Sequence, residues 1–362
     1  MQYAYSEWDE DLARQMMEMI GLIGLFHQLL LMTNGDVDQA FRLLKELQKR
    51  GLVDSNLNLD DFRQKLEEEN LIRQNPEGGY NLTRKGERQI RSESLEQIFS
   101  SLRKSGLGDH GVPIAGLGKE LLPETRPYEF GDPPEEIDFQ GTFRHAMKRG
   151  LDDLRIKPED FQVFETEMKT SCATVLLLDI SHSMILYGED RITPAKRVAL
   201  ALCELIMTRY PKDDLHVVAF GDDAREIKIG RLPYLSVGPY HTNTKAALEL
   251  AQRILLRKKQ TNKQIFMITD GKPSAIYEGK ELYKNPFGLD PKIVNQTLRE
   301  ADACRRHDIT ITTFMVARDS TLVDFVERLS RTNNGRAYLT SPGTLGEYLL
   351  VDYMRNRKKT VR

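Results

Sequence analysis

Five polar side chains, two carboxylates and three hydroxyls, lie in three short segments, two of them directly after apolar runs and one just before a helical pattern. They are Asp179, Ser181, Ser183, Thr242 and Asp270. All five donors are oxygens, the ligands that hard divalent cations prefer. Because the hydroxyls are neutral, they leave the charge of a cation only partly neutralised, while the carboxylates can hold its water ligands in place. The set therefore predicts a Mg²⁺ (or Mn²⁺) site whose ion still attracts an incoming carboxylate.

The elements that must position these side chains are short apolar runs separated by helical patterns. The runs lie at 175–178, 215–220, 265–268 and 309–316, and the helical patterns at 244–257, 291–307, 320–331 and 345–355. A further helix is expected to begin at Thr193-Pro194, with the threonine as N-cap. Continuous apolar runs are typical of strands buried on both faces, so we expect an α/β fold with a doubly wound, mostly parallel sheet. Ligands bind such sheets at the carboxyl ends of the strands, where Asp179 and Asp270 lie.

Two neighbouring positions leave alternatives open. Thr244 is a rival for the third hydroxyl, although we favour Thr242 because it precedes Asn243. His182 stands between the two serines, where it could act as a general base or shape the loop. The GxSxG pattern of serine hydrolases is absent, which favours the loop role for His182.

Catalysis is the main competing interpretation of Asp179. A carboxylate after a buried strand also suits a phosphotransferase nucleophile, but haloacid-dehalogenase-type enzymes need a second aspartate two residues later as the acid/base. Ser181 occupies that place. We therefore expect no enzymatic activity, and keep a metal-dependent phosphohydrolase as the alternative.

The motif order resembles a known family. DxSxS after a buried strand, a later threonine, and Thr-Asp-Gly after another buried strand are similar to the von Willebrand factor A (VWA) domain, over roughly residues 173–355. The resemblance implies a Rossmann-like domain with a metal-ion-dependent adhesion site. It implies metal contacts from Ser181, Ser183 and Thr242, with Asp179 and Asp270 acting mostly through water. It also implies a protein partner that supplies an Asp or Glu carboxylate to the metal.

A wider resemblance concerns the proteins with which such VWA proteins are associated. The stretches 126–132, 173–179 and 350–353 are similar to bacterial cytoplasmic VWA proteins associated with AAA+ ATPases of the MoxR or magnesium-chelatase type. This resemblance implies an accessory role in assembly, maturation or metal insertion, with an AAA+ ATPase as the partner.

The chain is expected to have three regions. Residues 1–105 are helical, with a glycine-containing turn at 75–79 and Thr83 as the N-cap of the next helix, an order similar to a winged helix. Residues 106–157 are rich in Gly and Pro and suggest an extended connector pinned to the fold. Residues 158–362 form the VWA domain with a basic tail, which suits a solvated end or docking onto an acidic surface.

Charge and composition bear on partners and compartment. The chain carries a net charge of -2, and residues 1–105 hold 18 acidic against 14 basic side chains, which argues against nucleic acid and favours protein contact. A winged-helix DNA-binding regulator stays as an alternative. No signal peptide or membrane-length apolar run is evident. Three cysteines without a CxxC pair suit a reduced, cytoplasmic compartment.

Overall fold

The computed structural model describes residues 10–54, 57–104, 121–128, 137–148, 156–166, 171–285, 287–316 and 320–356. The chain divides into two compact units. The first combines Met1–Leu107 with Ser171–Arg362, and the second is Gly108–Thr170. The helical region and the α/β region, at opposite ends of the sequence, thus belong to the same unit.

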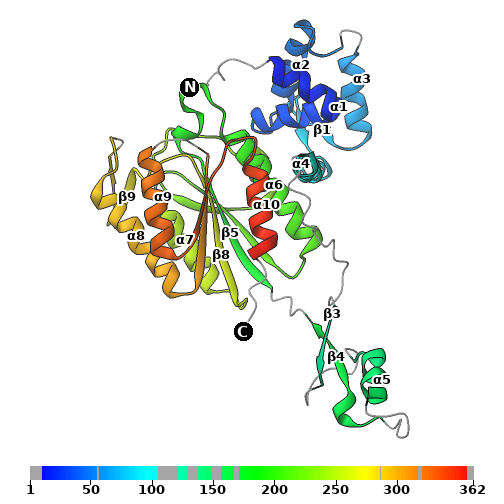
Figure 1. Ribbon diagram of the computed structural model, residues 1–362. Coiled ribbons are helices and arrows are strands. Elements are labelled where there is room, and N and C mark those ends of the chain that lie inside the picture. The colour runs from blue at the N-terminus through cyan, green and yellow to red at the C-terminus, as the bar shows by residue number, and fades with distance from the viewer. Residues whose placement is uncertain are drawn as a thin grey trace. The chain divides into compact units, whose positions relative to one another are not determined.

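A six-stranded sheet forms the centre of the first unit, in the order β12-β11-β8-β5-β6-β7 (Figure 1). Its strands are β5 (Cys172–Asp179), β6 (Asp214–Phe220), β7 (Ala224–Ile227), β8 (Asn262–Thr269), β11 (Ile309–Met315) and β12 (Arg336–Leu339). All neighbouring strands are parallel except β6 and β7, which are antiparallel. The four predicted apolar runs are the strands β5, β6, β8 and β11, which confirms the mostly parallel sheet. The edge strands β7 and β12 were not predicted.

Helices cover both faces of this sheet, as a doubly wound fold requires (Figure 1). On one face lie α6 (Ile192–Arg209) and α10 (Leu345–Asn356), and on the other α7 (Thr244–Leu256), α8 (Pro291–Arg306) and α9 (Ser320–Asn333). Side chains alternate along β5 because successive residues of a strand point to opposite faces. Leu176 and Leu178 join the core on the α6 side, whereas Val175 and Leu177 join the core on the α7 side.

The described residues of the N-terminal region form four helical elements, the first of them kinked at Gly21, and one short hairpin. Its elements are α1 (Glu10–Met32), α2 (Val37–Lys49), α3 (Leu59–Glu68), β1 (Ile72–Gln74), β2 (Tyr80–Leu82) and α4 (Arg84–Lys104). The Thr83 hydroxyl accepts a hydrogen bond from the Gly86 amide at 3.1 Å, which confirms Thr83 as the N-cap of α4. Among the residues that the structure describes, no helix is long and apolar enough to cross a bilayer.

Buried polar contacts join the N-terminal helices to α6. The Lys196 ammonium, fully buried in α6, donates to the Leu31 carbonyl at 2.5 Å and to Asn34 Oδ1 at 3.0 Å. Arg91 of α4 pairs with Glu204 of α6 at 3.2 Å between Nε and Oε2. Apolar side chains of both regions form one continuous core. The helical region expected at 1–105 therefore packs against the α/β part of the same unit, which begins at Ser171.

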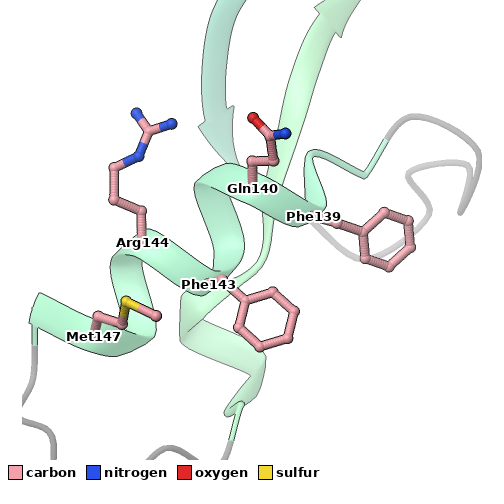
Figure 2. A pocket seen from close by; sticks show the side chains of 5 residues that line it. All are labelled: Phe139, Gln140, Phe143, Arg144 and Met147. Atoms are coloured by element: carbon pink, nitrogen blue, oxygen red, sulfur yellow. The ribbon is translucent and has the colours of Figure 1, made fainter.

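The second unit has elements of its own, both within 106–157, where an extended connector was expected, and within 158–170, which were expected to belong to the VWA domain. β3 (Leu121–Pro127) pairs antiparallel with β4 (Gln162–Thr166), and α5 (Phe139–Lys148) lies between them in sequence. α5 buries the small side chains Thr142 and Ala146. Its larger side chains Phe139, Phe143 and Met147 are exposed and line a shallow pocket, which Figure 2 shows.

Candidate metal centre

The predicted side chains meet at the carboxyl end of the sheet. Asp179 is the last residue of β5, Asp270 directly follows β8, and Thr242 lies in the loop before α7. The Ser181 hydroxyl lies 3.0 Å from the hydroxyls of both Ser183 and Thr242. Ser183 donates to Asp270 Oδ1 at 2.7 Å. The structure therefore joins the three hydroxyls and Asp270 in one hydrogen-bonded cluster.

Asp179 fixes the serine loop, which is the segment 180–183 that carries Ser181 and Ser183. Its Oδ1 accepts the Ser181 amide at 2.9 Å, and its Oδ2 accepts the Thr269 hydroxyl at 2.6 Å. The side chain is fully buried, and burial together with the nearby charge of Asp270 raises the pKa of Asp179 to about 7. Burial also raises the pKa of Asp270. Two buried carboxylates at one place are costly when both are ionised, so the site gains from a positive charge.

Thr242 is the threonine that joins the cluster. Asn243 caps α7 by accepting the Ala246 amide at 3.0 Å, so Thr244 is the first residue of the helix and Thr242 precedes the cap. Ser274 fixes the Thr242 backbone through two hydrogen bonds, of 3.0 Å to its amide and 2.9 Å to its carbonyl. The rival position Thr244 is thereby taken into the helix.

His182 ties two of the loops together. Its backbone amide donates to the Tyr240 carbonyl at 3.0 Å, which joins the serine loop to the loop that carries Thr242. Through this contact, the His182 backbone helps to fix the shape of both loops. Its side chain is half-buried.

The space beside Gly271 tests whether these residues suit a cation. A Cβ atom added at Gly271 would lie 2.6 Å from Thr242 Oγ1, 2.9 Å from Ser183 Oγ and 3.5 Å from Asp179 Oδ2. Oxygens from two segments, the turn after β5 and the loop before α7, thus lie around a small space that exists because residue 271 has no side chain. Mg²⁺ and Mn²⁺ take oxygen ligands of this kind, whereas zinc favours sulfur and nitrogen. The residues fit a small hard cation.

Arg191 belongs to the site and was not predicted. Its Nη1 donates to Asp270 Oδ2 at 2.6 Å, while Nε and Nη2 donate to Glu189 at 2.9 and 2.7 Å. The expected N-cap at Thr193 is wrong. α6 begins at Ile192 with Arg191 at the N-cap position, and the Asp190 carboxylate accepts the Thr193 amide at 3.0 Å. A basic residue just before this helix is the only sequence signal for the contact.

Comparisons with known proteins identify the family. Residues 172–354, just over half of the chain, match the family model described as "Rv0959-like protein, vWA domain". The chain belongs to this Rv0959-like vWA family. Residues 120–166 match a second model, "Rv0959-like protein, third domain". A vWA domain is consistent with a role in protein interaction.

Relatives and solved structures extend this likeness. Rv0959 of Mycobacterium tuberculosis and Mb0984 of Mycobacterium bovis are each 32% identical over 329 residues, covering 88% of this chain and 48% of the relative. The chain thus spans about half the length of these curated relatives. The vWF domain of the pilus tip protein Mfa5 from Porphyromonas gingivalis is 13% identical with a TM-score of 0.42, covering 53% of this chain and 98% of that domain. The PilB minor pilin from Streptococcus sanguinis is 13% identical with a TM-score of 0.44, covering 55% and 64%.

Proposed function

We propose that this vWA protein is a non-enzymatic factor that binds a protein partner through a divalent cation, Mg²⁺ or Mn²⁺. Ser181, Ser183 and Thr242 would contact the cation, and Asp179 and Asp270 would orient its water ligands. The observation that carries the proposal is the convergence of hydroxyls from separate loops on the space beside Gly271. A bound cation supplies the attraction for an Asp or Glu carboxylate of the partner.

The hydrogen bonds within the cluster prepare the hydroxyl oxygens for this task. Ser183 donates its proton to Asp270, and Thr242 donates its proton to Ser181. Ser183 also accepts the Ser181 hydroxyl, so each of the two oxygens keeps at least one lone pair for a cation in the space beside Gly271. Because the hydroxyl ligands are neutral, they reduce the charge of a cation less than carboxylate ligands would. The remaining charge favours an anionic partner.

The surroundings of Asp179 support binding over hydrolysis. A phosphohydrolase would need this carboxylate as a nucleophile with a free oxygen facing the substrate. Both of its oxygens accept hydrogen bonds from within the fold, and the side chain is fully buried. The position two residues later holds Ser181, which cannot serve as the proton donor.

We further propose that the partner is an AAA+ ATPase and that the protein acts in the cytoplasm, as an accessory factor in assembly, maturation or metal insertion. The likeness of residues 126–132 and 350–353 to ATPase-associated VWA proteins supports this role. In the winged-helix-like region, α3 carries four acidic side chains (Asp60, Asp61, Glu67 and Glu68) and two basic ones (Arg63 and Lys65), a net charge of -2. This net negative charge would repel phosphates and so favour protein contact over DNA.

The proposal is tested with the full chain. The immobilised protein is incubated with the MoxR-type ATPase of its own organism in Mg²⁺ or in EDTA, and Mn²⁺ binding is measured separately. We expect EDTA and Ser183→Ala to abolish capture, while Ser341→Ala, a matched serine outside the centre, behaves as wild type. Capture that survives both EDTA and Ser183→Ala would contradict the metal-dependent mechanism.

A further inference from the structure

A fixed positive charge lies inside the candidate centre. The Arg191 guanidinium, 13% exposed, contacts Asp270, whose side chain is fully buried. Its other edge contacts Glu189, which is 62% exposed. The Arg191 amide also donates to the Met184 carbonyl at 3.1 Å, so the backbone of η3 (His182–Gly188), which carries Ser183, holds this residue in place.

We infer that Arg191 determines the selectivity of the centre for an anionic partner. It lowers the affinity for the bare cation and leaves an excess of positive charge that the partner's carboxylate neutralises. This inference rests on the proposed function. The excess positive charge is the property that couples binding of the cation to binding of the partner.

The charge count supports the inference. A bound cation favours the ionised form of both carboxylates, so Asp179 and Asp270 contribute -2, Arg191 contributes +1, and a divalent cation brings the centre to +1. Without the guanidinium, the same cation would give a neutral centre. Glu189 adds a negative charge, but its exposed side chain is screened by water. Arg191 thus changes a neutral metal centre into a cationic one.

Arg191 and a cation need not compete for the same atom. Asp270 offers Oδ1 to the Ser183 hydroxyl and Oδ2 to Arg191, so each oxygen has its own partner. The guanidinium can therefore stay in place when the hydroxyls hold a cation. Arg191 then acts on the cation through its charge alone. Removing that charge should therefore strengthen binding of the bare cation, and removing a neighbouring negative charge should weaken it.

The test measures Mn²⁺ affinity of the full chain by electron paramagnetic resonance, without and with acetate as a carboxylate probe. Arg191→Gln is expected to bind bare Mn²⁺ on the order of tenfold more tightly, because a repulsive charge is removed. It should lose most of the increase in Mn²⁺ affinity that acetate produces in the wild type. Arg191→Lys keeps the charge and should retain that increase.

Glu189→Gln provides the opposite change. Removing this negative charge leaves Arg191 less compensated, so Mn²⁺ binding should weaken by about two- to threefold, a small effect because Glu189 is exposed. If Arg191 merely supported the loop, both glutamine variants would weaken binding, and the inference would be wrong. Mn²⁺ binding by the wild type with no gain in Arg191→Gln overturns this inference alone. A wild type that binds no Mn²⁺ overturns the proposed function with it.

Discussion

Gly271→Ala is the sharpest test of where a cation would lie. The added methyl group would meet Thr242 Oγ1 at 2.6 Å and Ser183 Oγ at 2.9 Å, whereas ordinary contact begins at 3.4 Å. The Thr242 oxygen must therefore retreat by about 0.8 Å (3.4 − 2.6), and the Ser183 oxygen by about 0.5 Å (3.4 − 2.9). Neither shift is small on the scale of a metal–oxygen bond.

The size of the effect follows from the geometry of the cation. Mg²⁺ holds its ligands at about 2.0–2.1 Å in near-ideal octahedral positions, so it cannot follow oxygens that move this far. Loss of a supporting group at a metal site typically lowers affinity about 10- to 100-fold, or about 1.4–2.8 kcal/mol. The backbone of Gly271 is outside the left-handed region, so alanine adds crowding rather than backbone strain.

The assay is isothermal titration of the full chain with Mg²⁺ and Mn²⁺, with thermal melting in EDTA to verify folding. Gly343→Ala is the matched control, because its methyl group would meet only Ser341 Oγ, at 4.0 Å. We expect wild-type affinity for the control and a large loss for Gly271→Ala. Wild-type affinity in both variants would refute the placement of a cation beside Gly271.

Two further predictions concern α6. Burial lowers the pKa of Lys196 from 10.5 to about 7. Between these values the unfolded chain binds more protons than the folded one, so stability should rise with pH by up to about 1.4 kcal/mol per unit, and Lys196→Met should remove this slope in urea titrations at several pH values. Glu204→Gln should cost about 3–5 kcal/mol of unfolding free energy, because it leaves Arg91 buried without a counter-charge. A loss below about 1 kcal/mol would mean that water reaches this pair.

The sequence predicted the parts of the sheet that are buried on both faces. β5 is buried along its whole length, so its apolar run is unbroken. The edge strands lack that signal. β7 exposes Arg225 and Glu226, and β12 alternates between half-buried and exposed residues over only four positions. Short, half-exposed strands form only by pairing with a neighbouring strand. Their own sequence does not reveal which strand that is.

In the candidate site too, some residues could be predicted from local sequence patterns and others could not. Four of its five predicted residues lie in motifs after strand ends and Thr242 lies just before a helix, so local patterns could find them, although their metal binding stays a prediction. Arg191 reaches Asp270 across 79 positions of sequence, and only the fold brings the two together. Lys196 contacts Leu31 across 165 positions. A lysine within a helix suggests a solvated face until the tertiary contact is known.

The shared core of α1, α4 and α6 limits how this protein can be divided, in the laboratory or in evolution. A fragment beginning at Ser171 would keep α6 but lose the helices that cover it, leaving Lys196 without its contacts to Leu31 and Asn34 and Glu204 without Arg91. Such a fragment would expose apolar surface and favour self-association. The vWA domain of this chain is therefore not an exchangeable module, and recombination that preserves it must carry the N-terminal helices along.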